Sequence, residues 1–225
     1  MLAAGDFDEQ RVVLDYYSNL AALLGPRTLA WFNHSGLWAP ETHTLHGSYD
    51  GPDWGCARPE GYPPWLGASP FIHLDAGGDS GTGEWALMAL DRLAHTGDAS
   101  FLPLAFGAAD FFMQHWPRLN ATTGRAVLWP VQVLEGWQCD FNASSGAFED
   151  CCSDDAPSIS GMLTLFEKLL QLPPAIATAE QRARWHEFSE LRMPALPLAA
   201  DGSGGVAAAR VLNRGGSGSG EGPTL

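Results

Sequence analysis

Apolar residues recur at helical spacing in two pairs of segments, and only a few residues join the members of each pair. Residues 84–96 and 98–116 form the first pair, joined at Thr96-Gly97-Asp98, and residues 158–171 and 179–192 form the second. Helices with so short a connection lie antiparallel and pack together, since each has an apolar face to bury. The pattern predicts an all-α fold built of helical hairpins.

Residues at the ends of these segments are typical of helix starts and helix ends. Asp98 precedes a helical segment, as an N-cap residue does, and Thr178 with Gln181 has the spacing of a capping box. Pro117 and Pro173-Pro174 follow helical segments, where a missing N–H group ends a helix. These signals predict where the four hairpin helices begin and end.

A further amphipathic helix is predicted over residues 8–24, with Asp6 or Asp8 as its cap and Gly25-Pro26 as its end. Residues 26–81 show no clear period and are rich in Gly, Pro, Trp, His and Asp. A segment of this length without a period is usually functional or partly disordered.

The remaining segments show little helical signal. Residues 126–133 are two short apolar stretches interrupted by Trp129-Pro130, which favours an extended loop or an edge strand. From Asp201 onward the chain is rich in Gly and Ser and cannot bury enough apolar surface to order itself. We expect one helical domain over residues 1–200 and a disordered tail over residues 201–225.

Composition restricts the class of partner. Of the 225 residues 45% are hydrophobic and 17% charged, and no stretch approaches the ~18 consecutive apolar residues of a membrane span. The net charge of −14 would repel nucleic acid and anionic lipid surfaces. Neutral ligands remain, and the nine tryptophans suit stacking on sugars as well as core packing. We expect a carbohydrate partner, no nucleic acid and no membrane span; the oligomeric state is not indicated.

Glycosylation signals point to a secreted protein. Asn33, Asn120 and Asn142 each begin an N-glycosylation sequon, and the chain has only five asparagines. The first residues lack the basic and apolar regions of a secretory signal. We expect an extracellular parent protein whose signal lies outside this chain.

The cysteines favour a disulfide over a metal site. Cys139, Cys151 and Cys152 cluster around one loop, while Cys56 lies far away in the sequence. No C-x-x-C spacing or nearby histidine suggests zinc, so we expect either unpaired cysteines or a single bridge from Cys139 to Cys151 or to Cys152. The chain also has no H-E-x-x-H motif, no phosphate-binding loop and no i, i+4 histidine pair. We expect neither a cofactor nor a metal.

Three motifs follow one another along the chain. They are Gly36-Leu37-Trp38-Ala39-Pro40-Glu41-Thr42 with His43; Gly83-Glu84-Trp85 with the Thr96–Leu102 turn and Phe111-Phe112; and Trp129–Glu135 followed by Asp155–Met162. In this order they resemble glycoside hydrolases of the six-hairpin (α/α)₆ toroid superfamily, in particular its α-L-fucosidase-like branch. The resemblance covers roughly residues 5–198. It implies hydrolysis of O-glycosyl bonds with inversion of configuration.

The resemblance also implies a fragment. A complete toroid contains twelve helices, whereas about five are indicated here, and the β-sandwich that usually precedes the toroid has no counterpart. Residues 1–200 would therefore form a partial toroid with long aromatic-rich loops. Such a fragment could lack part of its catalytic apparatus and be inactive.

Glycoside hydrolysis needs two carboxyl groups, one of which holds a proton near neutral pH. Glu135 is the candidate acid, because it ends an apolar run close to Trp137 and because toroid fucosidases place their acid in the corresponding loop. Asp154 and Asp155 are the nearest acidic pair and the candidates for the base. Asp155, directly before Ala156-Pro157, equally suits a helix N-cap.

Candidate substrate-binding residues flank these carboxyl groups or belong to the first motif. Trp129 and Trp137 bracket Glu135 and could stack on sugar rings, or could pack in the core. Glu41 and His43 could bind sugar hydroxyls or could anchor a loop.

The leading hypothesis is thus a glycosidase-like domain, and the alternative is a non-catalytic, carbohydrate-binding or structural remnant of such an enzyme. A toroid phosphorylase is a third hypothesis, which the scarcity of basic residues near Glu135 opposes.

Overall fold

The computed structural model describes residues 5–39, 81–129, 140–142, 144–145, 147–149, 153–200 and 206–208. Helices dominate this part of the chain, which confirms the all-α prediction at the level of fold class. They are α1 (Phe7–Phe32), α2 (Gly81–Thr96), α3 (Leu102–His115), α4 (Ala156–Leu170) and α5 (Ala179–His186), which continues as the π-helix η4 (Glu187–Arg192). Among them, none is both long and apolar enough to cross a membrane.

The first helix is longer than predicted. Gly25-Pro26 was expected to end it, but α1 continues through Pro26 to Phe32. Ala22, whose carbonyl loses its partner at Pro26, and Pro26 itself are both exposed, so water can solvate that carbonyl. Leu24 and Thr28 are buried on the opposite face and hold the helix together across the proline.

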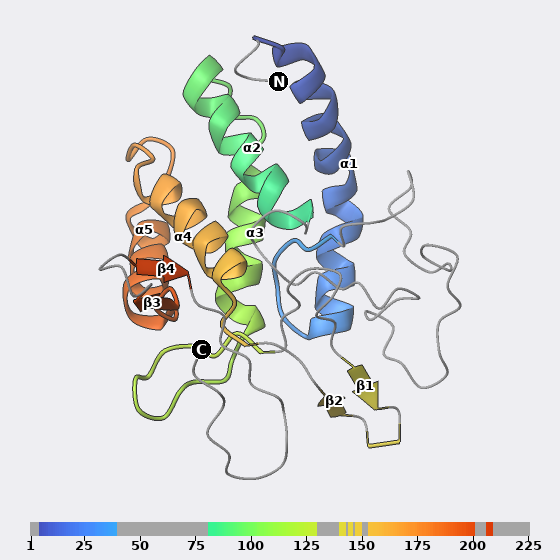
Figure 1. Cartoon of the computed structure of the whole chain (residues 1–225). Helices are drawn as coiled ribbons and strands as arrows, with labels where there is room; N and C mark the ends of the chain where they lie inside the picture. The colour runs from blue at the N-terminus through green and yellow to red at the C-terminus, as the bar shows by residue number, and fades with distance from the viewer. Residues whose placement is uncertain are drawn as a thin grey trace.

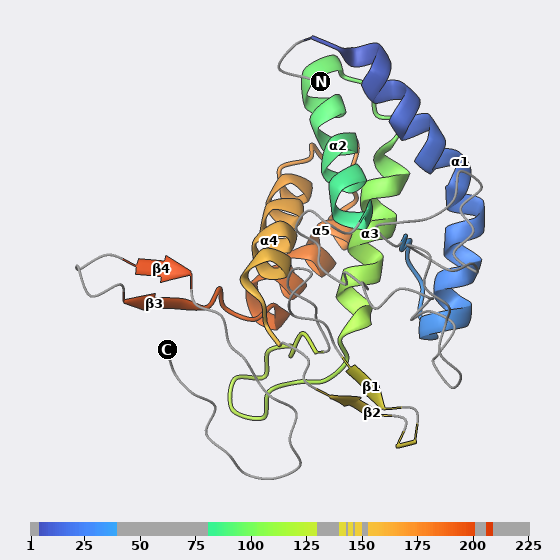
Figure 2. The same cartoon turned by 45° about the vertical axis from the view of Figure 1, so that its right-hand side comes forward.

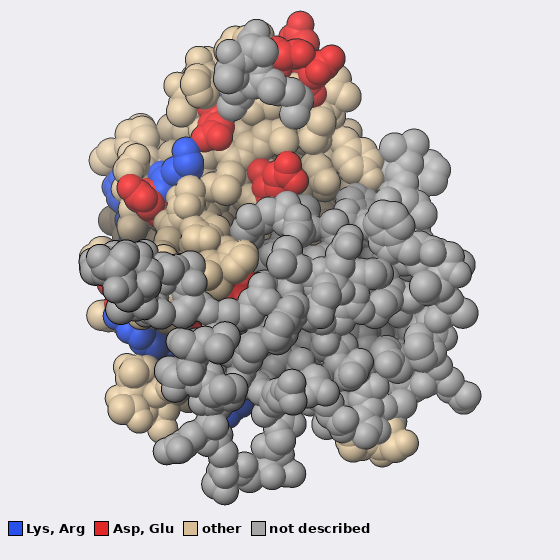
Figure 3. Space-filling view, in the orientation of Figure 1, with Lys and Arg blue, Asp and Glu red and all other residues tan. Residues whose placement is uncertain are grey.

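The start of α1 has the charges that a helix N-terminus favours. Asp6 is its N-cap and accepts a hydrogen bond from the backbone N–H of Glu9 at 3.3 Å. Asp8 and Glu9 lie in the first turn, and Figure 3 shows acidic side chains gathered over this end of the helix. Negative charge here complements the positive end of the helix dipole.

Helices α2 and α3 form the first predicted hairpin and pack along each other. Asp98 does not cap α3 as predicted, because the N-cap residue is Phe101, three residues later. Asp98 instead organises the turn: it accepts hydrogen bonds from the backbone N–H and hydroxyl of Ser100 at 3.0 and 2.6 Å. It also forms an ion pair with Arg92 of α2 at 2.9 Å.

We expect this turn to make stability depend on pH in the acid range. Hydrogen bonds from Ser100 and from Arg92 lower the pKa of Asp98 from 3.8 to about 2. The stabilisation is therefore fully present above pH 3.8 and is lost as the pH falls through about 2. Thermal unfolding of the parent and of Asp98→Asn should show a Tm difference that shrinks between these values; a constant difference would contradict the assignment.

Helices α4 and α5 form the second predicted hairpin. Asp155 is the N-cap of α4 and accepts from the backbone N–H of Ser158 at 2.8 Å. The predicted capping box of α5 is present, since Thr178 accepts from the N–H of Gln181 at 3.1 Å and the Gln181 side chain accepts from the N–H of Thr178 at 2.9 Å. Both cap predictions are confirmed.

The last helical turns follow a wider spiral than the sequence suggested. In η4 the backbone N–H of Met193 donates to the carbonyl of Phe188 at 2.8 Å, a spacing of five residues. Trp185 and Phe188 are buried, but Leu191, which α-helical spacing would place beside them, is 63% exposed. The wider π turn rotates Leu191 away from the core.

Successive helices alternate in direction (Figures 1 and 2), which creates two different ends. At one, here the turn end, short turns join α2 to α3 and α4 to α5. At the other, here the loop end, α1 and α3 finish and α2 and α4 begin. The candidate site residues that the structure describes lie next to helix termini at the loop end.

A short segment after α1, residues 33–39, crosses α3 in close contact and is called the crossing segment. The backbone N–H of Leu37 donates to the carbonyl of Gly107 at 2.8 Å. A Cβ atom on Gly36, which has φ +117°, would lie 2.4 Å from the backbone nitrogen of Phe111, and one on Gly107 would lie 2.4 Å from the side chain of Leu37. Glycine at both positions lets the two backbones approach.

Two antiparallel hairpins complete the described structure. Strands β1 (Asp140–Asn142) and β2 (Ala147–Glu149) pair with Phe141 opposite Phe148, and β3 (Leu198–Ala200) and β4 (Val206–Ala208) pair with Ala199 opposite Ala207. Strand β4 lies within residues 201–225, and its three residues pair with β3 through a backbone ladder. The other tail residues lie outside the described part. In residues 126–129 no strand forms, and Ala126 makes an isolated bridge with Leu119.

Candidate functional site

Asp154 and Asp155 stand immediately before α4, at the loop end. Asp154 has a left-handed backbone (φ +51°), which is uncommon for a residue with a side chain. Two hydrogen bonds join Asp154 to the backbone of Leu128, the residue before Trp129. The Leu128 N–H donates to the Asp154 carboxylate at 2.8 Å, and the Leu128 carbonyl accepts from the Asp154 N–H at 3.0 Å. The carboxyl group is thus positioned by the backbone of a segment 26 residues earlier in the chain.

The two neighbouring aspartates have different environments. Burial raises the pKa of Asp154, the Leu128 hydrogen bond opposes this, and the negative charge of Asp155 raises the pKa further. Asp155 is almost completely buried, and one carboxylate oxygen is committed to the cap of α4. Asp154 is therefore the member of the pair that is suited to proton transfer, whereas Asp155 has a structural role.

Trp129 follows Leu128 directly and is half-buried. It therefore lies one residue from the backbone groups that bind Asp154, in a segment fully buried at Leu128. An aromatic residue thus directly follows the residue that binds the perturbed carboxyl group. Glu135 and Trp137, the other members of the predicted set, lie outside the described residues.

The crossing segment leads toward Glu41 and His43, which also lie outside the described residues. Its last two described residues are buried and fixed to two helices. The N–H of Trp38 donates to the Thr28 hydroxyl of α1 at 3.2 Å. The N–H and carbonyl of Ala39 contact the Thr82 hydroxyl of α2 at 2.9 and 3.2 Å. The described part of the first motif, up to Ala39, is thus anchored to α1 and α2.

A pair of histidines at the same end was not predicted. His34 follows the C-cap of α1 and His115 is the last residue of α3, and their Nε2 and Nδ1 atoms lie 3.1 Å apart. Burial and the neighbouring His34 lower the pKa of His115 to about 3, and burial also lowers the pKa of His34. Both rings are neutral at pH 7. Because 81 residues separate the two histidines, no local motif in the sequence could reveal the pair.

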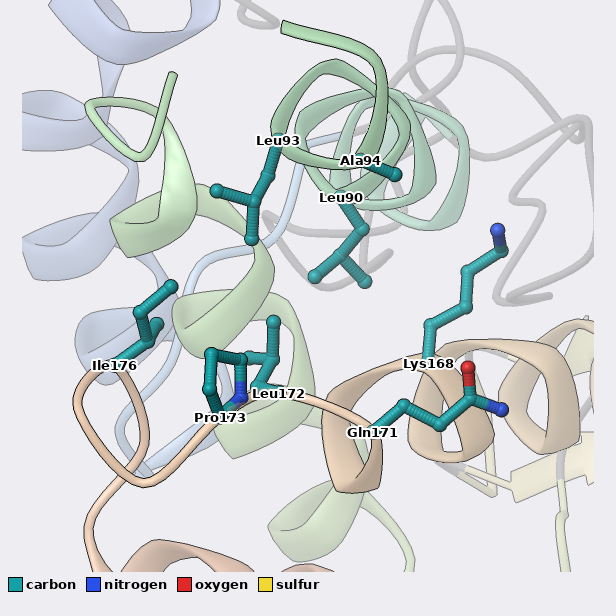
Figure 4. Close-up of a pocket in the computed structure, with 8 residues that line it drawn as sticks. All are labelled: Leu90, Leu93, Ala94, Lys168, Gln171, Leu172, Pro173 and Ile176. Carbon is teal, nitrogen blue, oxygen red and sulfur yellow. The ribbon is translucent and has the colours of Figure 1, made fainter. Parts of the chain in front are cut away.

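Two cavities occur elsewhere in the described part. One, of about 350 Å³, lies at the turn end and is lined mostly by apolar side chains of α2 and of the turn between α4 and α5 (Figure 4). Its only cation, Lys168, forms an ion pair with Asp91 at 2.7 Å. It lies about 20 Å along α4 from Asp154 at 1.5 Å per residue. A polar cavity of about 200 Å³ is lined by α3 and α5–η4 residues including Arg184 and Arg192. Neither contains a predicted site residue.

The sequons are only partly described. Asn33 is exposed at the C-cap of α1 in a left-handed conformation, where asparagine is favoured. Asn120 is exposed in a turn, and its side-chain oxygen accepts from the N–H groups of Thr122 and Thr123. Asn142 lies in β1. Glycosylation at the three residues stays a prediction, and Cys139 and Cys151 lie outside the described residues.

No family model, no curated protein and no solved structure matches this chain. Within the described residues, no group of three or more His, Cys, Asp or Glu side chains converges on one point. The resemblance noted from the three motifs therefore stays a prediction, and the site is characterised by its own geometry.

Proposed function

We propose that this chain is a glycoside hydrolase-like domain that acts on O-glycosyl bonds of a neutral carbohydrate. The observation that carries the proposal is Asp154, a half-buried carboxyl group with a raised pKa, held by Leu128 beside a buried second carboxylate. Perturbed carboxyl groups of this kind are typical of acid–base sites. The three motifs identified in the sequence direct the proposal to sugars, with α-L-fucosides among the substrates to test.

In this mechanism Asp154 is the general base and Glu135 the general acid. A raised pKa makes a carboxylate a stronger base while it remains ionised, so Asp154 suits the removal of a proton from water. Glu135 would donate a proton to the leaving oxygen, and the water would attack the opposite face of the sugar with inversion. Trp129 would stack on the sugar ring near Asp154, as aromatic side chains commonly do.

The proposal includes a partial (α/α)₆ toroid. Alternating helices, short turns at one end and helix termini with site residues at the other support this arrangement. In the proposed toroid, the loop end carries the substrate site. Secretion of the parent protein and glycosylation at the three sequons belong to the same proposal.

The test is hydrolysis of a panel of aryl glycosides, including the α-L-fucoside, by the parent, Asp154→Asn and Glu135→Gln. We expect each variant to lose about 100-fold in kcat/KM, the lower range for a positioned acid or base. Asparagine tolerates a left-handed backbone and its amide oxygen can accept from Leu128, so the fold should persist. Detection of the first-formed anomer by NMR would report inversion.

Asp155→Asn is the matched control, because asparagine caps a helix as well as aspartate does. It should keep its activity if Asp155 is a structural cap. Equal losses in the Asp154 and Asp155 variants would contradict the assigned roles, and a loss below roughly tenfold in Glu135→Gln would contradict the acid role.

A second candidate function is carbohydrate binding without catalysis. The use of Asp155 as a helix cap favours it, because this leaves Asp154 as the one member of the described pair that is not committed to a helix cap. A folded parent that binds a sugar without turnover, with unchanged affinity in Asp154→Asn, would support this function over hydrolysis.

A further inference from the structure

The histidine pair at the loop end joins two helices that are distant in sequence. His34 lies just beyond α1 and His115 ends α3, so the pair forms only when the crossing segment is seated on α3. The Nε2 atom of His34 and the Nδ1 atom of His115 lie 3.1 Å apart.

The hydrogen bonds of His34 determine which of its nitrogens is unprotonated. Its Nδ1 lies 2.8 Å from the carbonyl oxygen of Ser35, which can only accept, so Nδ1 carries the proton. The neutral ring therefore has its lone pair on Nε2, directed toward His115. Histidines that bind metals usually donate their other ring N–H to such a carbonyl group, and His34 has this arrangement.

The distance between the two nitrogens suits a chelated metal ion. Zinc–nitrogen bonds of about 2.0–2.1 Å at angles of about 90–110° separate two ligand nitrogens by about 2.9–3.4 Å. The observed 3.1 Å falls in this range. Without a metal, His115 Nδ1–H donates to His34. With one, both rings turn so that the lone pairs of His34 Nε2 and His115 Nδ1 converge on the ion, and His115 carries its proton on Nε2, so each ring stays neutral.

The surroundings hold the ligands in place and keep them unprotonated. The His115 ring packs against Phe32, Phe111 and Trp116, with centroid distances of 4.9, 4.6 and 5.0 Å. Burial lowers the pKa of both histidines, so neither needs to release a proton at pH 7 before binding a metal.

We propose that His34 and His115 together bind one divalent transition-metal ion, with zinc as the probe. Imidazole suits zinc, copper and nickel, and hard cations such as magnesium prefer oxygen ligands. In the described part of the chain no third protein ligand completes the site. Water fills the remaining positions, so affinity is moderate. This site goes beyond the proposed glycosidase chemistry, which uses no metal.

The test is calorimetric titration of the chelator-treated full chain with zinc chloride. We expect saturable binding that weakens at least about tenfold in His34→Ala and in His115→Gln, since even the loss of a second-shell partner costs that much. His95→Ala and His186→Ala, which change exposed histidines at the ends of α2 and α5, are matched controls and should bind like the parent.

A second readout covers the case in which His115→Gln does not fold. Nitrogen-15 NMR of the parent histidines should show zinc-dependent shifts at His34 Nε2 and His115 Nδ1. The proposal is overturned by the absence of zinc binding, by equal zinc affinity in His34→Ala and the parent, or by histidine nitrogen signals that do not respond to zinc.

Discussion

Gly36→Ala is expected to lower the free energy of unfolding by about 3–5 kcal/mol, the sum of an unfavourable backbone conformation and a clash in a packed region. The φ angle of Gly36 is +117°, and an added Cβ would lie 2.4 Å from the backbone nitrogen of Phe111 and 2.5 Å from its Cα. A backbone neighbour in the middle of α3 cannot move aside as a flexible side chain could. The crossing segment cannot withdraw either, because Leu37 and Trp38 are hydrogen bonded to α3 and α1.

Urea unfolding monitored by tryptophan fluorescence would measure the effect. Gly97→Ala is the matched control, since Gly97 also has a positive φ, +74°, but an added Cβ would meet nothing within 4 Å. Gly97→Ala should lower the free energy of unfolding by only about 1–2 kcal/mol, the cost of a left-handed backbone for a residue with a Cβ atom. If the two variants were equally stable, the close contact between the crossing segment and α3 would be wrong.

Arg92→Met is expected to destabilise the protein by about 2–4 kcal/mol, because it removes one partner of a largely buried ion pair. Arg92 is only 7% exposed. Its guanidinium pairs with Asp98 in the α2–α3 turn at 2.9 Å and donates to the carbonyl of Phe7, at the start of α1, at 2.8 Å. It also lies 5.6 Å from the ring centre of Phe101. One side chain thus joins three parts of the turn end.

Lys168→Met is the matched control for this prediction. Lys168 of α4 pairs with Asp91 of α2 at 2.7 Å, but the two side chains are 39% and 38% exposed. Exposed pairs contribute about 0–1 kcal/mol, so this variant should unfold close to the parent in the same urea titration. If the two variants lost similar amounts of unfolding free energy, burial of Arg92 would not determine the strength of its contacts.

Local signals in the sequence were sufficient for most helices and caps. The capping box of Thr178 and Gln181 and the N-cap at Asp155 were predicted because both depend on residues within three positions. The prediction failed at Pro26, where burial of Leu24 and Thr28 on one face outweighs the proline. It also failed at Asp98, because Arg92 and Ser100 bind this carboxylate in the turn.

In the candidate site, too, the sequence predicted some features and tertiary contacts decided others. Asp154 and Asp155 could be singled out from the sequence as an acidic pair, and the cap role of Asp155 could be weighed there. Their different environments follow from Leu128, whose backbone binds Asp154, and from the unequal burial of the two carboxyl groups.

The sequence by itself determined the helical hairpins, because periodicity and capping act over a few residues. Only the tertiary structure decided that the crossing segment packs on α3, that Asp154 is held by Leu128, and that His34 meets His115 across 81 residues. These contacts depend on how the helix faces pack and on the space left by Gly36 and Gly107. Local sequence patterns carry no information about which distant backbone will occupy that space.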